Sequence, residues 1–188
     1  FGRTISTMCK PRGFGDFNGD TRSDVAFTCA GDNTVYNWLS TGTGFTQEKV
    51  GNFSAGWNLV SAADVDGDGK SDLIWHNPQA GIVNVWLMNG SGLTSYFGKA
   101  ISPNSTARAF GDTNGDGRAD ITWTCVGDNT VYMWFSTGND FAQQKVGNFS
   151  AGWSLVSGSD VDGNGKSDLL WYQQTSGTLN VWLMDGAS

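Results

Sequence analysis

Residues 64–75 read Asp64-Val-Asp66-Gly-Asp68-Gly-Lys-Ser-Asp72-Leu-Ile-Trp75, an acidic, glycine-rich turn that leads directly into an apolar segment. The same nine-residue pattern, D-x-[DN]-G-[DN]-x-x-x-D, starts again at residues 16, 112 and 160, so its four copies begin 48 residues apart. Two aromatic series keep this interval: Trp38, Trp86, Trp134 and Trp182, and Phe27, Trp75, Trp123 and Trp171. A fixed period of this length indicates a chain built from structural repeats.

The sequence also repeats with a longer period of 96 residues, twice the short one. Residues 1–92 match residues 97–188 at 56 of 92 positions. Odd-numbered and even-numbered copies therefore differ from each other, and the chain is a duplicated pair of repeats.

Each copy is predicted to form four short strands. In the second copy, apolar or alternating segments bounded by Gly, Asn and Asp predict strands at residues 59–65, 73–77, 82–88 and 93–99. Four strands in about 48 residues is the size of one β-propeller blade. The sequence thus predicts an all-β fold, a single β-propeller domain over residues 1–188 with four four-stranded blades. The repeats lie at approximately 1–48, 49–96, 97–144 and 145–188.

The phase of the repeats suggests how such a ring closes. Residues 1–6 align with residues 97–102, the last strand of a blade, whereas Ser188 stops just before that strand would begin in the fourth copy. The N-terminal strand is therefore expected to complete the fourth blade and to hide its open edge. The alternatives are that the chain is part of a seven- or eight-bladed ring, or that two chains join into eight blades.

Each acidic turn is expected to bind Ca²⁺. Oxygen-bearing side chains occupy turn positions 1, 3, 5 and 9. Hard oxygen ligands on a flexible turn suit Ca²⁺ better than Mg²⁺, which requires strict octahedral geometry. The alternative is that these are ordinary Asp, Asn and Gly turns. The predicted ligands of up to four Ca²⁺ ions are Asp16, Asn18, Asp20 and Asp24; Asp64, Asp66, Asp68 and Asp72; Asp112, Asn114, Asp116 and Asp120; and Asp160, Asp162, Asn164 and Asp168.

Position 6 of the turn is predicted to need a positive φ, which Gly adopts without strain. Gly69, Gly117 and Gly165 stand there, but the first copy has Thr21. The first turn is therefore expected to be strained and to bind more weakly, and the second turn, with four carboxylates, to bind most tightly. The expected role of the metal is to stabilise the folded blades.

The turns and the strands that follow them resemble a known repeat. Gly15-Asp-Phe-Asn-Gly-Asp20 with Asp24-Val-Ala-Phe27, and residues 64–75, are similar to FG-GAP or VCBS repeats, and the resemblance covers all four copies. It implies a calcium-binding β-propeller of the kind found in extracellular adhesion proteins, in lectins and beside secreted enzymes. The departures are Thr21, Asn164 in place of Asp, and a copy number below the seven of integrin-type rings.

The sequence predicts no catalytic residue. His76 is the only histidine, and its equivalents in the other copies are Thr28, Thr124 and Tyr172, so a Ser-His-Asp or Cys-His site would rest on one unrepeated residue. The acidic residues outside the turns are scattered, and they are Asp32, Glu48, Asp128, Asp140 and Asp185. We therefore expect a binding module rather than an enzyme.

Two identical segments are candidates for carbohydrate binding of a lectin-like kind. Gly-Asn-Phe-Ser-Ala-Gly-Trp occurs at 51–57 and 147–153, and its tryptophan corresponds to Cys9 and Ser105 in the odd copies. A blade thus does not require this tryptophan, whereas the fourfold Trp series suits core packing. The candidate ligand residues are Asn52, Phe53, Trp57, Asn148, Phe149 and Trp153. The alternatives are that these tryptophans merely pack between blades, or that the chain is a protein-binding adhesion or scaffold propeller or an accessory domain of a secreted hydrolase.

Cysteine usage points to an oxidising compartment. Folding the first hairpin about Asp20 places Cys9 diagonal to Cys29, which predicts a disulfide between them. Cys125 repeats Cys29 but has Ser105 where its partner would stand, so it is expected to be free. A disulfide together with calcium turns favours a secreted, extracellular protein.

The formal charge of −7 comes from 18 acidic and 11 basic residues, and 13 of the acids lie in the four turns. Four bound Ca²⁺ ions would raise that charge by eight, to +1. Nucleic acid is excluded as a partner because clustered Lys and Arg are missing, and membrane insertion because no apolar run approaches about 20 residues. The expected partner is a glycan or glycoprotein, bound by a monomer or homodimer.

Overall fold

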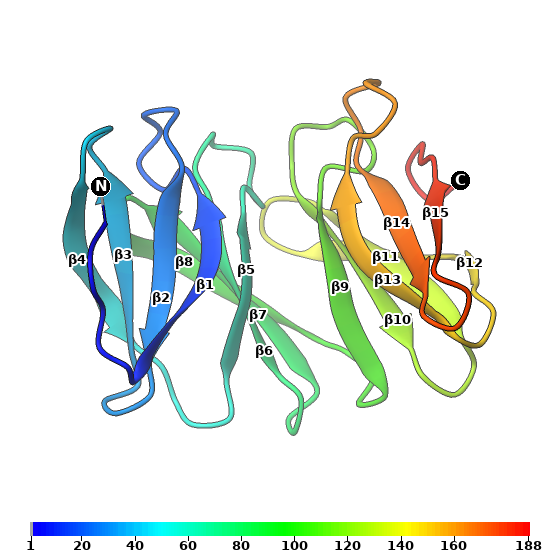
Figure 1. Cartoon of the computed structure of the whole chain (residues 1–188), viewed down its shortest axis with the longest axis horizontal. Helices are drawn as coiled ribbons and strands as arrows, with labels where there is room; N and C mark the ends of the chain where they lie inside the picture. The colour runs from blue at the N-terminus through cyan, green and yellow to red at the C-terminus, as the bar shows by residue number, and fades with distance from the viewer. Residues whose placement is uncertain (1) are drawn as a thin grey trace. The chain divides into compact units, whose positions relative to one another are not determined.

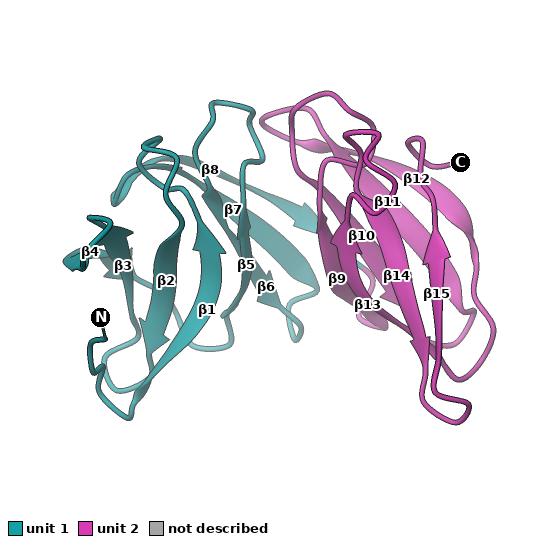
Figure 2. Ribbon diagram, turned by 45° about the horizontal axis from the view of Figure 1, so that its top comes forward, with its two compact units in different colours: residues 1–101 teal, residues 102–188 magenta. Residues whose placement is uncertain are grey.

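The computed structural model of the protein describes residues 2–188 and is all-β (Figure 1). The described residues form fifteen strands in four antiparallel sheets. The chain divides into two compact units, residues 1–101 and residues 102–188, and each unit holds one pair of sheets (Figure 2). Among the described residues there is no helix that could cross a membrane.

The first unit contains two four-stranded sheets, blade 1 in the order β1-β2-β3-β4 and blade 2 in the order β5-β6-β7-β8. Each strand pairs antiparallel with the next strand along the chain, so each sheet is a meander. The strands predicted in the second copy match those observed to within two residues. The bounds are β1 (Cys9–Gly15), β2 (Asp24–Cys29), β3 (Thr34–Ser40), β4 (Phe45–Asn52), β5 (Asn58–Ala63), β6 (Asp72–Asn77), β7 (Ile82–Asn89) and β8 (Gly92–Ala100).

The second unit repeats this arrangement with one strand fewer. Blade 3 has the order β9-β10-β11-β12, and blade 4 contains β13, β14 and β15 within the described part of the chain. The bounds are β9 (Ser105–Gly111), β10 (Asp120–Cys125), β11 (Thr130–Ser136), β12 (Phe141–Asn148), β13 (Trp153–Ser159), β14 (Asp168–Gln173) and β15 (Thr178–Trp182). The predicted fold class, an all-β protein of four propeller blades, is confirmed.

The fourth strand expected for blade 4 from the N-terminal segment is not formed. Phe1 lies outside the described residues, and residues 2–6 belong to no strand. This segment instead lies on blade 1, where Arg3 Nη1 donates to the carbonyl oxygen of Phe45 at 3.0 Å and Ile5 packs against the cluster around Phe27. The N–H of Cys9 donates to Ser6 O at 2.9 Å. This tight turn and the apolar surface that receives Ile5 direct the segment onto its own blade.

The core of each unit lies between its two blades, because the apolar face of one sheet needs a second sheet to cover it. The strands β1 and β5 lie side by side, as do β9 and β13. The fourfold tryptophans pack inside the protein as predicted, but in two places. Trp86 and Trp182 are partly buried against these core clusters. Trp38 is buried in a separate cluster with Phe27 and Cys29, and Trp134 is buried against Trp123 and Phe141. The core residues include Ala26, Val35, Leu73 and Trp75 in the first unit and Val131, Met133, Leu169 and Trp171 in the second.

One residue bulges from the first strand of every blade. These residues, at the breaks in register, are Arg12, Val60, Arg108 and Val156. In blade 1 the bulge moves Cys9 from the expected diagonal position to one directly opposite Cys29, and the two cysteines form a disulfide. In blade 3 it places Ser105 opposite Cys125, which is buried and free. The extra residue bends the strand and changes which residues lie opposite each other on the far side of the bulge.

Candidate functional site

The first aspartate of each acidic turn organises the backbone of the turn. In the second turn, Asp64 Oδ1 accepts the N–H of Gly67 at 2.7 Å and Oδ2 accepts that of Gly69 at 2.9 Å. The other three turns have the equivalent bonds, made by Asp16, Asp112 and Asp160. Each turn therefore closes around one carboxylate, and all four take the same shape.

Position 6 of the turn has a positive φ in all four copies, as predicted. The values are 85° at Gly69, 83° at Gly117, 83° at Gly165 and 68° at Thr21. A β-branched residue in this left-handed region is strained. The first turn keeps its shape at an energetic cost that the other three turns do not have.

The ninth aspartate of each turn is buried and joins two strands. The side chain of Asp72 accepts the N–H of Val65 at 2.8 Å through Oδ2 and that of Met88 at 2.9 Å through Oδ1. Asp24, Asp120 and Asp168 make the equivalent pairs of bonds, and none of the four is more than 1% exposed. This carboxylate fixes the start of the turn to the end of the third strand of its blade.

Burial shifts the acidity of these carboxyl groups. Desolvation raises the pKa of Asp72 to about 7, and the neighbouring carboxylates of Asp66 and Asp64 add to the rise. Desolvation likewise raises the pKa of Asp24 and Asp120. Although burial acts to raise the pKa of Asp16 too, hydrogen bonds from four backbone N–H groups lower it. A buried carboxylate beside other carboxylates is a group that a bound cation stabilises in its ionised form.

The residues of the turns fit a calcium ion. Asp64, Asp66 and Asp72 each offer an oxygen within 4.8 Å of the others, and Asp160, Asp162 and Asp168 do the same. All donors are hard oxygens, as Ca²⁺ prefers, and the ninth carboxylate of each of these two turns, Asp72 or Asp168, is buried. The second and fourth turns thus could hold Ca²⁺ through positions 1, 3 and 9 of the predicted ligand set.

Ion pairs at turn position 5 were not anticipated from the sequence. The carboxylate there pairs with the basic residue two positions later, in Asp20 with Arg22, Asp68 with Lys70 at 3.3 Å and Asp116 with Arg118 at 2.8 Å. In the fourth turn the residue is Asn164, and Lys166 pairs with Asp185 instead. The regular basic residue at position 7 was the signal in the sequence for these pairs.

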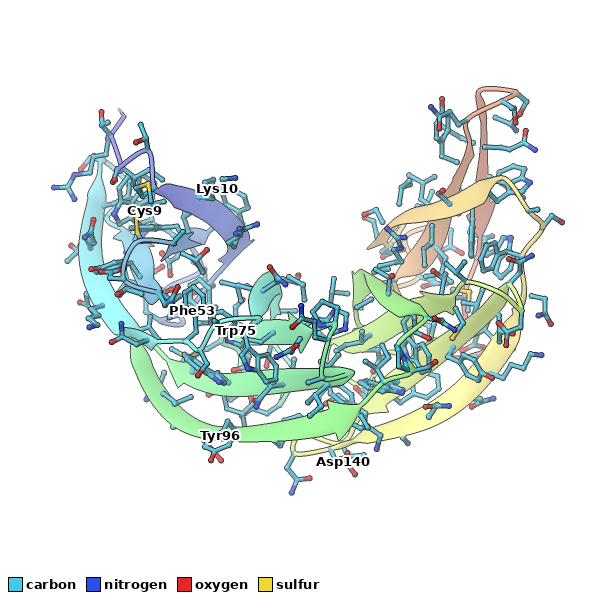
Figure 3. The ribbon with its side chains drawn as sticks, turned by 90° about the horizontal axis from the view of Figure 1, so that it is seen from below. Cys9, Lys10, Phe53, Trp75, Tyr96 and Asp140 are labelled. Carbon is cyan, nitrogen blue, oxygen red and sulfur yellow. A yellow bond between two sulfur atoms is a disulfide. The ribbon has the colours of Figure 1, made fainter. Side chains whose placement is uncertain are left out.

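In the first unit the candidate aromatic residues line a cavity of about 340 Å³, which we call the first cavity. Phe53 and Trp57 from the segment before β5 form one wall, and β1 with the end of β2 forms the other. Both aromatic residues also pack against the core cluster, and the Phe53 ring lies 5.1 Å from that of Trp75 (Figure 3). The N–H of Phe53 donates to Asn33 O of the facing blade at 2.8 Å. The wall is therefore held in place from both sides.

The second unit has a cavity of about 170 Å³ around the equivalent aromatic segment, which we call the second cavity. The indole Nε1 of Trp171 is buried and has no hydrogen-bond partner among the described residues. A free donor beside aromatic faces is suited to a hydroxyl group of a ligand or a water. The lining residues are Asn148, Phe149, Ser150, Trp153, Trp171, Asn180 and Trp182.

The two candidate asparagines donate hydrogen bonds within their own blades, blade 1 for Asn52 and blade 3 for Asn148. Asn52 Nδ2 donates to Asp32 O at 3.1 Å and to Thr34 Oγ1 at 3.0 Å, and Asn52 is not among the residues that line the first cavity. Asn148 Nδ2 donates to Thr130 Oγ1 at 3.1 Å in the same way, although Asn148 does line the second cavity. The structure thus brings together five of the six candidates in two cavities and leaves Asn52 at the rim.

The first cavity and the acidic turns lie at opposite ends of the strands of a blade. In blade 1 the turn follows the end of β1, whereas the cavity wall begins at the start of β1 and the end of β2. A strand of seven residues spans about 20 Å. A calcium ion in the turn would therefore support the fold without touching a ligand in the cavity.

A third cavity, of about 500 Å³, lies on blade 1 beside the disulfide. Ile5 and Ser6 of the N-terminal segment line it together with Phe27 and Tyr36. The sequence did not indicate this cavity, because residues 1–6 were expected to extend blade 4 instead.

His76, the only histidine, lies in β6 opposite Asn58 of β5 and Val83 of β7. It is 9% exposed, and this burial lowers the pKa of its imidazole. The side chain is part of the packed sheet, which agrees with its unrepeated occurrence in the sequence.

The chain was compared with proteins of known sequence and structure. No match was found among curated proteins. Among solved structures it is similar to the Photorhabdus luminescens Tc holotoxin pore, with a TM-score of 0.60, 18% identity, 94% of this chain covered and 9% of that one. It is also similar to the β-propeller domain of Myceliophteria thermophila Cps50 (Swd1), at a TM-score of 0.52 and 8% identity, with 94% and 52% covered. The chain therefore spans about half or less of these relatives, and at such identities they show the fold alone.

The model of the FG-GAP-like repeat matches the chain three times, over residues 16–75, 64–123 and 112–171. Each match runs from the first aspartate of one acidic turn to the aromatic residue that follows the next turn, so it contains two turns and the strands between them. The matches together cover more than half of the chain and agree with the propeller blades of the structure. The chain belongs to the FG-GAP-like repeat family, as a β-propeller of the binding or scaffold kind.

Proposed function

We propose that this chain is a non-catalytic, extracellular carbohydrate-binding module stabilised by Ca²⁺. The observation that carries the proposal is the pair of cavities in its two units, each walled by the Phe and Trp of the same seven-residue segment. Sugars are bound by stacking on aromatic faces, with hydroxyl groups paired to fixed polar partners. Trp153 and Phe149 beside the free Trp171 N–H supply both kinds of contact.

The calcium ions have a structural role in this proposal. Each turn would be neutralised by a cation at the buried ninth aspartate, and binding only to the folded chain adds stability by mass action. Extracellular Ca²⁺ is abundant enough for weak extracellular sites to be filled, and the Cys9–Cys29 disulfide is stable in the same compartment.

A glycan array probed with the calcium-loaded chain tests the proposal. We expect binding to a subset of glycans, and we expect Trp57→Ser together with Trp153→Ser to abolish it, since serine already occupies the equivalent position 105 in the third copy. Tyr96→Ser is the matched control, because Tyr96 is 67% exposed on β8 and lies outside both cavities (Figure 3). If the chain binds no glycan at millimolar Ca²⁺, the carbohydrate-binding proposal is wrong and the protein-binding alternative is favoured.

The metal is tested separately by counting bound Ca²⁺ and measuring thermal unfolding before and after EDTA. We expect up to four ions per chain and a lower melting temperature after chelation. A chain that carries no metal and melts at the same temperature with EDTA would refute the calcium role while leaving the sugar sites to the array.

A further inference from the structure

The first cavity is positively charged within an acidic protein. Lys10 and Arg12 of β1 line it together with Phe53 and Trp57. None of its described lining residues is Asp or Glu, although acidic residues outnumber basic ones by 18 to 11 in the chain. Asp32, in the nearby turn, lines the third cavity instead. The cavity thus has two cationic groups beside two aromatic rings.

The two basic side chains keep their charges available. Arg12 is the bulged residue of β1, and its Nε donates to Thr28 Oγ1 at 3.2 Å, which anchors the guanidinium and leaves its Nη groups out of that bond. Lys10 lies opposite Thr28 in the sheet register. In the described part of the chain, no salt bridge engages either residue.

The second cavity differs from the first in charge. The position of Lys10 is Thr106 in the third copy, and no described residue that lines the second cavity is Lys or Arg. Arg108 occupies the same bulge as Arg12 but is not among the lining residues. The aromatic segment is identical in both units, but the second cavity is smaller and is lined by Trp171, Asn180 and Trp182 rather than by the first strand of the preceding blade. The cationic wall is therefore a feature of the first cavity.

We infer that the first cavity binds a sugar that carries an anionic group, a carboxylate or a sulfate, between Lys10 and Arg12, with the sugar ring against Trp57. This inference rests on the proposed function and specifies the ligand of one of its two sites. A guanidinium and an ammonium pair with a carboxylate or sulfate oxygen through charge-assisted hydrogen bonds, which are the stronger class. The second cavity, which lacks basic side chains, accommodates neutral sugars.

Calorimetric titration of the calcium-loaded chain with three disaccharides of one linkage tests the inference: a glucuronic acid disaccharide, its neutral glucose counterpart, and a sulfated form of the latter. We expect an anionic form to bind about tenfold more tightly than the neutral one, with an affinity that falls as salt increases. The comparison of the carboxylate and sulfate forms identifies the anion. Lys10→Thr with Arg12→Val should lower the affinity for the anionic disaccharide to that for the neutral one and remove the salt dependence.

Two further variants separate this inference from the proposed function. Trp57→Ser should weaken binding of the anionic disaccharide, and Arg108→Val in the second unit should leave it unchanged; far-UV circular dichroism and thermal unfolding establish that each variant is folded. Equal affinities for charged and neutral disaccharides, both reduced by Trp57→Ser, would overturn the inference and keep the proposed function. No binding of any of the three would count against both. Anion binding that persists undiminished in the Lys10 and Arg12 double variant would place the charge recognition elsewhere and overturn the inference.

Discussion

The backbone N–H of Ser71 donates to the carbonyl oxygen of Asp16 at 2.6 Å, so the acidic turn of blade 1 is bonded directly to the acidic turn of blade 2. Ser167 and Asp112 form the same bond at 2.6 Å in the second unit. Asp16 and Asp112 are also the carboxylates around which their own turns close. The acidic turns of two paired blades are therefore joined by a backbone hydrogen bond in each unit.

This contact depends on the glycine that precedes the turn. A Cβ on Gly15 would lie 2.6 Å from the Cβ of Ser71, whereas a Cβ on Gly51 would meet nothing within 4 Å. We expect Gly15→Ala to lower the free energy of unfolding by about 1–3 kcal/mol through overpacking. Gly51→Ala is the matched control and should change it by no more than about 0.5 kcal/mol. Urea unfolding of both variants checks this, and equal stabilities would show that the two turns separate at little cost.

Strain at Thr21 is tested by exchanging it with the residue of the other copies. Thr21→Gly should raise the free energy of unfolding by up to about 1 kcal/mol, because Gly adopts the positive φ without steric strain. The reverse change, Gly69→Thr, introduces the same strain into the second turn and should lower stability by about 1–2 kcal/mol. Both are measured by urea unfolding at saturating Ca²⁺. A loss of stability in Thr21→Gly would mean that the threonine side chain contributes more than its backbone strain costs.

Blade 3 has the geometry for a second disulfide. Ser105 Oγ contacts Cys125 Sγ, and the two residues are directly opposite in the sheet, as Cys9 and Cys29 are in blade 1. Ser105→Cys should therefore oxidise with Cys125 and stabilise the chain by about 3 kcal/mol, the value for a closed loop of this size. Thiol titration and unfolding with and without reductant measure both effects. A variant that retains two titratable thiols under oxidising conditions would contradict the observed register.

The buried imidazole of His76 makes part of the stability depend on pH. Because burial lowers its pKa below the ordinary 6.5, the unfolded chain binds the proton more tightly than the folded chain. Its contribution is therefore complete above pH 6.5 and is lost as the pH falls through 6.5 toward the lower folded value. His76→Thr carries the residue found at the buried positions 28 and 124, and it should lack this loss.

The measurement is the difference in unfolding free energy between wild type and His76→Thr at several pH values, at constant saturating Ca²⁺. All carboxyl groups are common to the two proteins and cancel in the difference. We expect the wild type to lose stability relative to the variant below pH 6.5. A difference that stays constant across that range would show that the imidazole is protonated equally in both states.

The sequence predicted the strands and the common shape of the four acidic turns well because both follow a repeat of constant length. With no insertions, one well-marked copy such as residues 64–75 sets the register of the others. The difference between odd and even copies likewise directed attention to Trp57 and Trp153, which do line cavities. Whether the turns hold Ca²⁺ stays a prediction.

The parts that sequence reasoning missed depend on contacts between distant segments. The bulge at Arg12 is a single residue without a distinctive signature, so Cys9 was expected diagonal to Cys29 rather than opposite it. Lys10 and Arg12 reach the first cavity from a different blade than Trp57, more than forty residues away along the chain. Likewise, alignment with residues 97–102 could not show that Ile5 packs on its own blade instead of forming a strand.

The acidic turn of blade 1 and the first cavity lie at opposite ends of the strand β1, and this separation has a practical use. A dye or a surface tether attached through a cysteine introduced at the exposed Ser23 would lie at the acidic turn and leave the aromatic wall open to solution. The same separation lets the residues of the wall be varied in a library while the turns keep the scaffold folded. Blade 1 can in this way be immobilised at its acidic turn while the residues of the cavity wall are varied.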